Sequence, residues 1–232
     1  MLKYGLYLPN FGAFGRPQAV VEMAKIAEAS GWDGIFIWDH INRNIQTEVV
    51  DPWIALTAVA MATERLVFGP LVTPLARRRP WKLAREAATL DILSDGRLVL
   101  GVGLGGFSGA DAEWGAFGEE RDMKVRAAMT DEALAILDGL WSGNPFSFEG
   151  QHYQVNESQF LPRPAQQPRI PIWIAGYYPY RKPMRRAAKW DGMFILFDDE
   201  TDKLAALKDT LSYVREQRQS DAPFDAVFID KE

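Results

Sequence analysis

The chain has 232 residues, 47% of them hydrophobic, which is enough for one large α/β domain with a sizeable core. It carries 26 Lys and Arg against 31 Asp and Glu, a formal net charge of −5 without any basic run, which argues against nucleic acid or anionic membranes as partners. It has no cysteine, which excludes disulfides, a thiol nucleophile and a thiolate metal site, and we expect no metal.

The start of the chain also bears on where the protein works. Residues 1–5 lack the charged start and long apolar core of a signal peptide. No apolar run approaches the ~20 residues needed to span a bilayer. We therefore expect a soluble, cytoplasmic protein.

The first part of the chain alternates between short apolar runs and helical patterns. Residues 3–8 are predicted to form a strand. Pro17 stands at a first helical position, and apolar residues at helical spacing continue to Ala29. Residues 35–38 (Ile-Phe-Ile-Trp) are uncharged and rich in β-branched and aromatic side chains, which is typical of a strand buried on both faces.

The same alternation continues to the end of the chain. The further predicted helices are 51–62, 81–93, 123–141, 184–189 and 202–218. The further predicted strands are 66–72, 98–102, 170–175, 191–196 and 224–229. Because proline is unfavourable in a central strand, Gly69-Pro70 predicts a bulge within 66–72.

Two segments depart from the alternation. Residues 104–121 are predicted to form an irregular insertion, and 146–155 a small hairpin outside the main sheet. Trp114 and Phe117 of the insertion are expected either to line a pocket or to pack as a small cluster under the loop.

Residues 1–232 contain no linker, so we expect a single domain with a parallel sheet and helices outside it. Seven strands of this kind fit either an open doubly wound sheet or a (β/α)₈ barrel that lacks its last unit.

Asp39 and His40 follow the buried strand 35–38 directly, at the sheet edge where α/β folds bind ligands. His152 is the only other histidine, and histidine often works near neutral pH. The pair is either functional or a cap for the loop that follows.

Two loops at the same edge have the composition of ligand-binding loops. The glycines of 101–106 would let backbone approach a flat or phosphorylated ligand, although their place after the fourth strand argues against a dinucleotide fingerprint. In the loop 176–183, free N–H groups with Arg181 and Lys182 would suit a phosphate, or the two cations form a solvated helix face. We call the opening at the carboxyl ends of the strands the mouth. The residues expected to line it are Asn10, Asp39, His40, Thr73, 103–106 and 176–182.

Six stretches spread over nearly the whole chain form a specific set. They are 4–9, 29–34 leading to 38–40, 64–74, 90–103, 170–176 and 185–192. Together and in this order, they make the chain resemble the luciferase-like monooxygenases, the flavin- and deazaflavin-dependent oxidoreductases related to bacterial luciferase.

The resemblance implies a (β/α)₈ barrel that binds FMN or the deazaflavin coenzyme F420 at the carboxyl ends of its strands. His40 would be the general acid or base, oriented by Asp39, and this pair looks like the form of the deazaflavin branch, which favours that coenzyme. A strained peptide, here Pro70–Leu71, would lie behind the ring. The implied cofactor-binding residues are Asn10, Asp39, Pro70, Leu71, Thr73, Gly103, Gly105, Gly106, Ala175, Gly176, Tyr177 and Arg181.

The chain departs from the family pattern in two places. The phosphate loop reads Gly-Tyr-Tyr-Pro at 176–179 rather than a run of glycines. The strands also stop after the seventh, so closing the barrel would need a rearrangement, further chain or another subunit, and we expect a homodimer.

We therefore expect an oxidoreductase that transfers hydride to, or monooxygenates, a small organic substrate. One alternative is a flavin-binding relative without turnover, which the missing eighth unit favours. Another is a hydrolytic barrel that pairs Asp39 with a second carboxylate such as Glu113.

Overall fold

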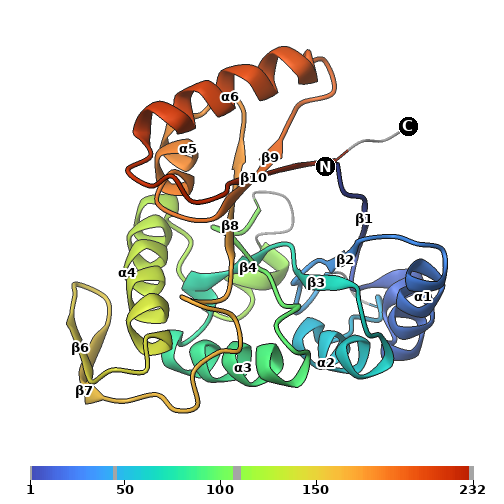
Figure 1. Ribbon diagram of the computed structural model, residues 1–232, viewed down its shortest axis with the longest axis horizontal. Helices are drawn as coiled ribbons and strands as arrows, with labels where there is room; N and C mark the ends of the chain where they lie inside the picture. The colour runs from blue at the N-terminus through green and yellow to red at the C-terminus, as the bar shows by residue number, and fades with distance from the viewer. Residues whose placement is uncertain (1, 44–45, 107–110, 230–232) are drawn as a thin grey trace.

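The computed structural model describes residues 2–43, 46–106 and 111–229, with helices packed around parallel strands (Figure 1). The strands are β1 (Gly5–Leu8), β2 (Gly34–Ile37), β3 (Val67–Pro70), β4 (Thr73–Pro74), β5 (Leu100–Gly103), β6 (Phe146–Glu149), β7 (Gln154–Ser158), β8 (Ile172–Tyr177), β9 (Gly192–Leu196) and β10 (Asp225–Phe228). The helices are α1 (Pro17–Ala29), α2 (Pro52–Ala62), α3 (Pro80–Leu93), α4 (Met123–Trp141), α5 (Arg181–Ala187) and α6 (Lys203–Gln217). Short helical turns are η1 (Gly12–Phe14), η2 (Leu75–Arg77) and η3 (Asp111–Gly115).

The strands that alternate with helices run parallel and form one continuous series. Hydrogen bonds join β1, β2 and β3 in one sheet, and β4, β5, β8, β9 and β10 in another. A parallel bridge between Phe68 of β3 and Leu98, just before β5, connects the two sheets. When β3 and β4 are counted as one interrupted strand, the described residues contain seven parallel strands, as the sequence predicts.

The strand β2 shows why the sequence forms two apolar layers. All four of its residues are buried. Ile35 and Ile37 join the large cluster between the strands and the outer helices, whereas Phe36 points the opposite way. Phe36 belongs to a smaller inner cluster that also contains Leu71, Val99, Trp173 and Phe194. Alternation with a period of two is what a strand between two layers requires.

The bulge predicted within 66–72 is present, and its position corrects one expectation. β3 ends at Pro70, and β4 begins three residues later. The non-proline cis peptide lies between Leu71 and Val72, not at Pro70–Leu71 as expected. The Leu71 N–H still donates to the carbonyl of Ile37 at 2.7 Å. The Pro70–Leu71 peptide therefore remains in the ladder with β2, and the chain leaves the ladder one peptide later.

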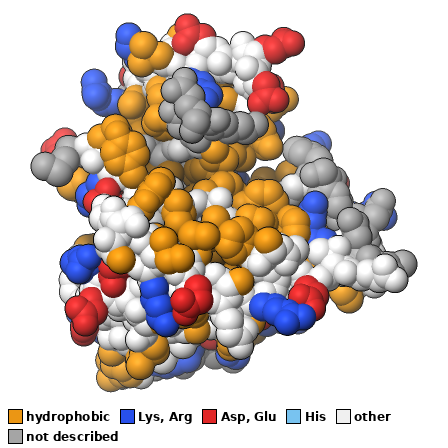
Figure 2. Space-filling view, turned by 90° about the vertical axis from the view of Figure 1, so that its right-hand side faces the viewer, with side chains coloured by type: hydrophobic (Ala, Val, Ile, Leu, Met, Phe, Trp, Pro, Cys, Tyr) orange, Lys and Arg blue, Asp and Glu red, His pale blue; other side chains and the backbone are white. Residues whose placement is uncertain are grey.

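The series of strands is open on one side. Among the described residues no pairing joins β10 to β1, so these two strands form the free edges. Tyr7 of β1 and Val227 of β10 both pack against the inner cluster, which therefore reaches the opening. Figure 2 views the molecule from the side, and hydrophobic side chains gather there in a hollow between its upper and lower parts. An eighth strand of a closed barrel would lie between β10 and β1.

The helix α5 begins earlier than predicted. It starts at Arg181 instead of residue 184, which moves Arg181 and Lys182 from the loop into the first helical turn. The reason is Pro183, because proline is tolerated in a first turn, where its missing N–H has no intrahelical partner to lose.

The hairpin predicted at 146–155 is present as the antiparallel pair β6 and β7, which stands apart from the parallel strands (Figure 1). Residues 107–110 of the insertion lie outside the described residues. No described helix is both long enough and apolar enough to cross a bilayer.

Candidate functional site

Aromatic side chains line the carboxyl ends of β1 and β2. The ring centroid of Trp38 lies 5.6 Å from those of Tyr7, Phe11 and His40. Phe11 and His40 are also 5.6 Å apart and meet edge to face. Nε1 of Trp38 is buried and has no hydrogen-bond partner among the described residues. The mouth thus offers apolar walls and one unused donor, which suits a planar ring with polar edges.

Asp39 is buried, and its carboxylate ties the base of the mouth together. Its two oxygens accept from Arg78 at 3.0 and 2.8 Å, and Oδ1 also accepts from Arg77 at 2.9 Å. Oδ2 accepts from Thr73 Oγ1 at 2.7 Å and from Trp53 Nε1 at 3.4 Å. The predicted site residues Asp39 and Thr73 therefore bond directly to each other, and both arginines lie beside them.

The carboxylate that reaches His40 is Glu113, from the turn η3. Nδ1 of His40 lies 3.0 Å from Oε2 of Glu113. The expectation that Asp39 orients His40 is therefore wrong. Successive side chains at a strand end point to opposite sides, so Asp39 faces the arginines while His40 faces the insertion. The sequence suggests Glu113 only as a hydrolytic partner of Asp39, because nothing in the spacing brings residue 113 next to residue 40.

Arg77 connects the two carboxylates. Its Nη2 donates to Oδ1 and to the backbone carbonyl of Asp39, and its Nη1 lies 3.4 Å from Oε2 of Glu113. The side chain of Arg77 is 3% exposed and that of Glu113 is 8% exposed. Because these charges are buried, loss of Arg77 would remove a compensating charge from both carboxylates at once.

The charge state of Glu113 follows from these contacts. Burial by itself raises the pKa of the Glu113 carboxyl. The contacts with His40 and Arg77, together with the Ile41 N–H, outweigh burial and hold this pKa below its ordinary value. Glu113 is therefore an anion near neutral pH.

Asn10 is fully buried at the end of β1 and holds the backbone of His40. Its Nδ2 donates to the carbonyls of His40 and Val50 at 2.8 and 2.7 Å, and its Oδ1 accepts from the His40 N–H at 3.2 Å. Both polar atoms of the Asn10 side chain are used inside the protein. The structure therefore brings Asn10 to the mouth as a tether of the His40 backbone.

The predicted glycines after β5 pack tightly. A Cβ on Gly103 would lie 2.4 Å from Cγ2 of Val72, and one on Gly105 would lie 2.4 Å from the ring of Trp114. Gly105 also has a φ of +84°, which disfavours any L side chain. Gly106 is exposed. The close packing accounts for two of these glycines without a ligand.

Trp114 anchors the described part of the insertion. It is 1% exposed, and the guanidinium groups of Arg126 and Arg77 lie 4.2 and 5.8 Å from its ring centroid. Phe117 is 56% exposed. Of the two aromatic residues singled out in the insertion, Trp114 packs under the loop and Phe117 does not.

The predicted residues Ala175, Gly176 and Tyr177 end β8 on the far side of the mouth. A Cβ on Gly176 would lie 2.2 Å from Cβ of Pro183, whereas Tyr177 is 45% exposed. Burial, with a smaller contribution from Tyr177, raises the pKa of the Tyr7 hydroxyl far above its ordinary value. Tyr7 therefore keeps its proton near neutral pH.

Arg181, predicted to hold a phosphate, is engaged elsewhere. It pairs with Asp209 of α6 at 2.9 Å, and its guanidinium lies 4.7 Å from the ring centroid of Tyr213. The side chain is 42% exposed, so this pair is a surface contact of small energetic value. Arg181 would have to leave Asp209 to reach a ligand in the mouth.

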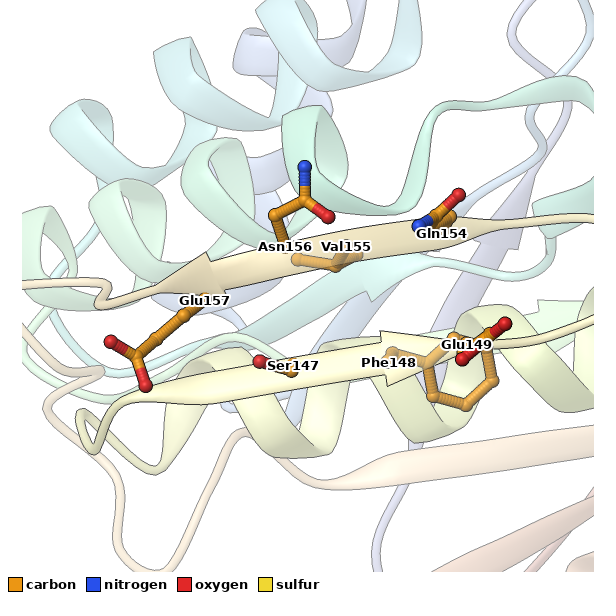
Figure 3. A pocket seen from close by; sticks show the side chains of 7 residues that line it. All are labelled: Ser147, Phe148, Glu149, Gln154, Val155, Asn156 and Glu157. Atoms are coloured by element: carbon orange, nitrogen blue, oxygen red, sulfur yellow. The ribbon is translucent and has the colours of Figure 1, made fainter.

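A surface pocket of about 410 Å³ lies on the hairpin β6–β7 (Figure 3), which is on the opposite side of the molecule from β1 and β2 (Figure 1). Its lining residues are Ser147, Phe148, Glu149, Gln154, Val155, Asn156 and Glu157. Its two carboxylates point away from each other in Figure 3. In the part of the chain that the structure describes, no group of three or more His, Asp or Glu side chains could hold a metal ion.

Known proteins share sequence with this chain. Residues 4–227 match the family model of the luciferase-like monooxygenases. The F420-dependent glucose-6-phosphate dehydrogenase of Amycolatopsis mediterranei (strain U-32) is 34% identical over 178 residues, which cover 75% of this chain and 52% of the relative. The F420-dependent hydroxymycolic acid dehydrogenase of Mycobacterium tuberculosis is 32% identical over 167 residues, with 71% and 45% covered. The chain spans about half the length of these curated relatives.

Solved structures share its fold. An F420-dependent secondary alcohol dehydrogenase, in complex with an F420-acetone adduct, superposes with a TM-score of 0.82 at 22% identity, covering 97% of this chain and 68% of that one. The oxygenating constituent of 3,6-diketocamphane monooxygenase from Pseudomonas putida, in complex with FMN, superposes with a TM-score of 0.75 at 20% identity, with 98% and 66% covered. The predicted α/β fold of the TIM-barrel type is confirmed.

Proposed function

Because the chain belongs to the luciferase-like monooxygenase family, we propose that it is a flavin- or deazaflavin-dependent oxidoreductase acting on a small organic substrate, by hydride transfer or monooxygenation. The observation that carries the proposal is the imidazole of His40, held by Glu113 in a mouth walled by Tyr7, Phe11 and Trp38. A bound flavin or deazaflavin ring supplies the hydride chemistry, and the protein supplies position and proton transfer.

Each side chain has a stated task in this proposal. His40 would be the general acid or base, and Trp38 Nε1, which has no hydrogen-bond partner among the described residues, would donate to a polar edge of the ring. Asp39 and Asn10 act indirectly, since their polar atoms are used inside the protein. The other residues proposed to lie against the cofactor are Pro70, Leu71, Thr73, Gly103, Gly105, Gly106, Ala175, Gly176, Tyr177 and Arg181.

We propose coenzyme F420 as the preferred cofactor and FMN as the alternative. The names of the two curated relatives above support F420. FMN stays in consideration because a solved structure of the same fold holds it. We also propose a homodimer that works in the cytoplasm, supported by the free edges of β1 and β10 and by a cysteine-free sequence that is compatible with a reducing compartment.

The proposal is tested by fluorescence titration with F420 and FMN, each oxidised and reduced. We expect F420 to bind more tightly than FMN, and Trp38→Ala to weaken binding about tenfold, the order of one aromatic contact. Trp81→Ala, on α3 outside the mouth, is the matched control and should leave binding unchanged. Binding of FMN alone would overturn the cofactor preference, and binding of neither would overturn the proposed function.

A flavin-binding protein without turnover is the second candidate, favoured by the opening between β1 and β10. Oxidation of reduced cofactor above the uncatalysed rate, with a substrate present, would exclude it. The hydrolytic alternative loses support because Arg77 lies between Asp39 and Glu113 and contacts both carboxylates, so the two do not face each other across a space for substrate.

A further inference from the structure

We propose that Glu113, carried by η3, is the positioning residue for His40: it holds the imidazole proton on Nδ1 and so presents Nε2 to the mouth as the nitrogen that exchanges a proton. This inference rests on the proposed function, in which His40 moves a proton. Glu113 itself does not touch the reacting atoms.

The first step is the burial of one edge of the imidazole. Nδ1 is buried and lies 3.0 Å from Oε2 of Glu113, an ion-pair contact that does not meet hydrogen-bond geometry in this structure, whereas 21% of the His40 side chain is exposed. The exposed fraction therefore belongs to side-chain atoms other than Nδ1, and we infer that Nε2, at the opposite edge of the ring, is the nitrogen that faces the mouth. A carboxylate accepts and cannot donate, so a neutral imidazole paired with it must carry its hydrogen on Nδ1.

The second step is that Glu113 is itself held in one orientation. Its Oε1 accepts from the N–H groups of Ile41 and Asn42 at 2.8 and 3.4 Å, which leaves Oε2 toward His40. Arg77 lies 3.4 Å from the same Oε2. The carboxylate is thus fixed at both oxygens before it meets the imidazole.

The third step is that the His40 backbone is fixed independently. Asn10 bonds both the N–H and the carbonyl of His40. Asn10 therefore holds the backbone that carries the imidazole, and Glu113 lies beside its Nδ1. Asp39 is connected to His40 only through Arg77 and Glu113. Nη2 of Arg77 bonds to Asp39, and its Nη1 approaches Glu113.

The test reads the tautomer of His40 in the cofactor-free protein. Because the chain has two histidines, His152→Gln leaves His40 as the single imidazole, and its ¹⁵N shifts can be assigned without ambiguity. At about pH 8, above the ordinary pKa of free histidine, we expect a protonated Nδ1 and an unprotonated Nε2. A protonated Nε2 in this protein would overturn the inference, whatever later variants do.

Variants at position 113 then test whether Glu113 causes the tautomer preference of His40. In Glu113→Gln the amide can donate as well as accept, so we expect a mixture of both tautomers, whereas Glu113→Asp should restore part of the Nδ1 form. Glu120→Gln, on the same insertion, is the matched control and should keep the wild-type spectrum. An unchanged tautomer in Glu113→Gln would show that Glu113 does not position the ring.

Turnover measured with the cofactor-bound protein distinguishes a failure of this inference from a failure of the proposed function. We expect His40→Ala to lose about 10²–10⁴-fold in turnover, and Glu113→Gln to lose about 10–100-fold with little change in KM. Unchanged turnover in His40→Ala would overturn the proposed function while leaving the tautomer result intact. Inactive His40→Ala with fully active Glu113→Gln would overturn only the positioning role.

Discussion

Four side chains at the mouth form one line of charge contacts, from Asp39 through Arg77 to Glu113 and His40. Each carboxylate in this line has a cationic or N–H partner, which is the condition for keeping charge away from water. The imidazole stands at the end of the line, where it meets the exposed mouth. A substitution within the line therefore changes both the local charge balance and the group that faces a ligand.

The lowered pKa of Glu113 predicts a contribution to stability that depends on pH. Its folded-state pKa lies below the ordinary 4.5, so the unfolded chain binds the proton more readily and stability falls as pH falls through this range. We expect the gap in unfolding free energy between wild type and Glu113→Gln to shrink between about pH 6 and pH 3. Urea unfolding at several pH values measures it, with Glu157→Gln on exposed β7 as control. A gap that stays constant would contradict the prediction.

At the scale of elements, the mouth is assembled by tethers between loops that are distant in sequence. Asn10, at the end of β1, bonds both to the residue after β2 and to Val50, just before α2. Trp114 fills the space left by Gly105 and so ties η3 to the end of β5. The helices and strands bring these loops close, and single buried side chains then fix them.

The tether at Asn10 has a measurable energy. Asn10→Ala would remove the partners of the His40 backbone and of the Val50 carbonyl, and we expect it to cost about 2–4 kcal/mol of unfolding free energy, since unsatisfied buried groups cost about 1–3 kcal/mol each. Denaturant unfolding measures the change. Asn156→Ala, on the exposed face of β7, should stay within about 0.5 kcal/mol. A loss for Asn10→Ala no larger than that of the control would argue against the tether.

At the scale of the whole molecule, the decisive feature is the opening between β1 and β10. Both edges carry backbone groups without strand partners among the described residues, and the inner apolar cluster extends to them. Proteins rarely leave such edges uncovered, because an exposed edge templates further pairing. The hydrophobic hollow in Figure 2 is the surface at which the homodimer proposed above would place a second copy.

The proposed homodimer is tested at this edge. We expect the wild type to sediment as a dimer, and Phe228→Lys on β10 to shift it toward monomer, because a lysine on an edge strand opposes pairing. Leu161→Lys is the matched control, since Leu161 is 57% exposed and lies in the connector after β7. A wild type that sediments as a monomer at every concentration would contradict the homodimer, and equal effects of both variants would contradict its place at β10.

Local pattern predicted the elements well where apolar periodicity and caps agree. The helix over 123–141 has the predicted bounds, and the bulge within 66–72 follows from its Gly-Pro pair. Local pattern failed where one residue has two compatible roles. Pro183 is compatible both with a loop before α5 and with the first turn of α5, and the structure has the second.

The sequence by itself determined the alternating architecture, the family and the presence of Asp39 and His40 at a strand end, because these depend on local periodicity and on residue order. Only the tertiary structure decided which carboxylate holds His40. Asp39 is adjacent in sequence yet turns to Arg77 and Arg78, whereas Glu113 approaches from an irregular segment 73 residues away. The physical reason is that strand geometry sends neighbouring side chains to opposite sides, while contacts across loops depend on how the whole chain packs.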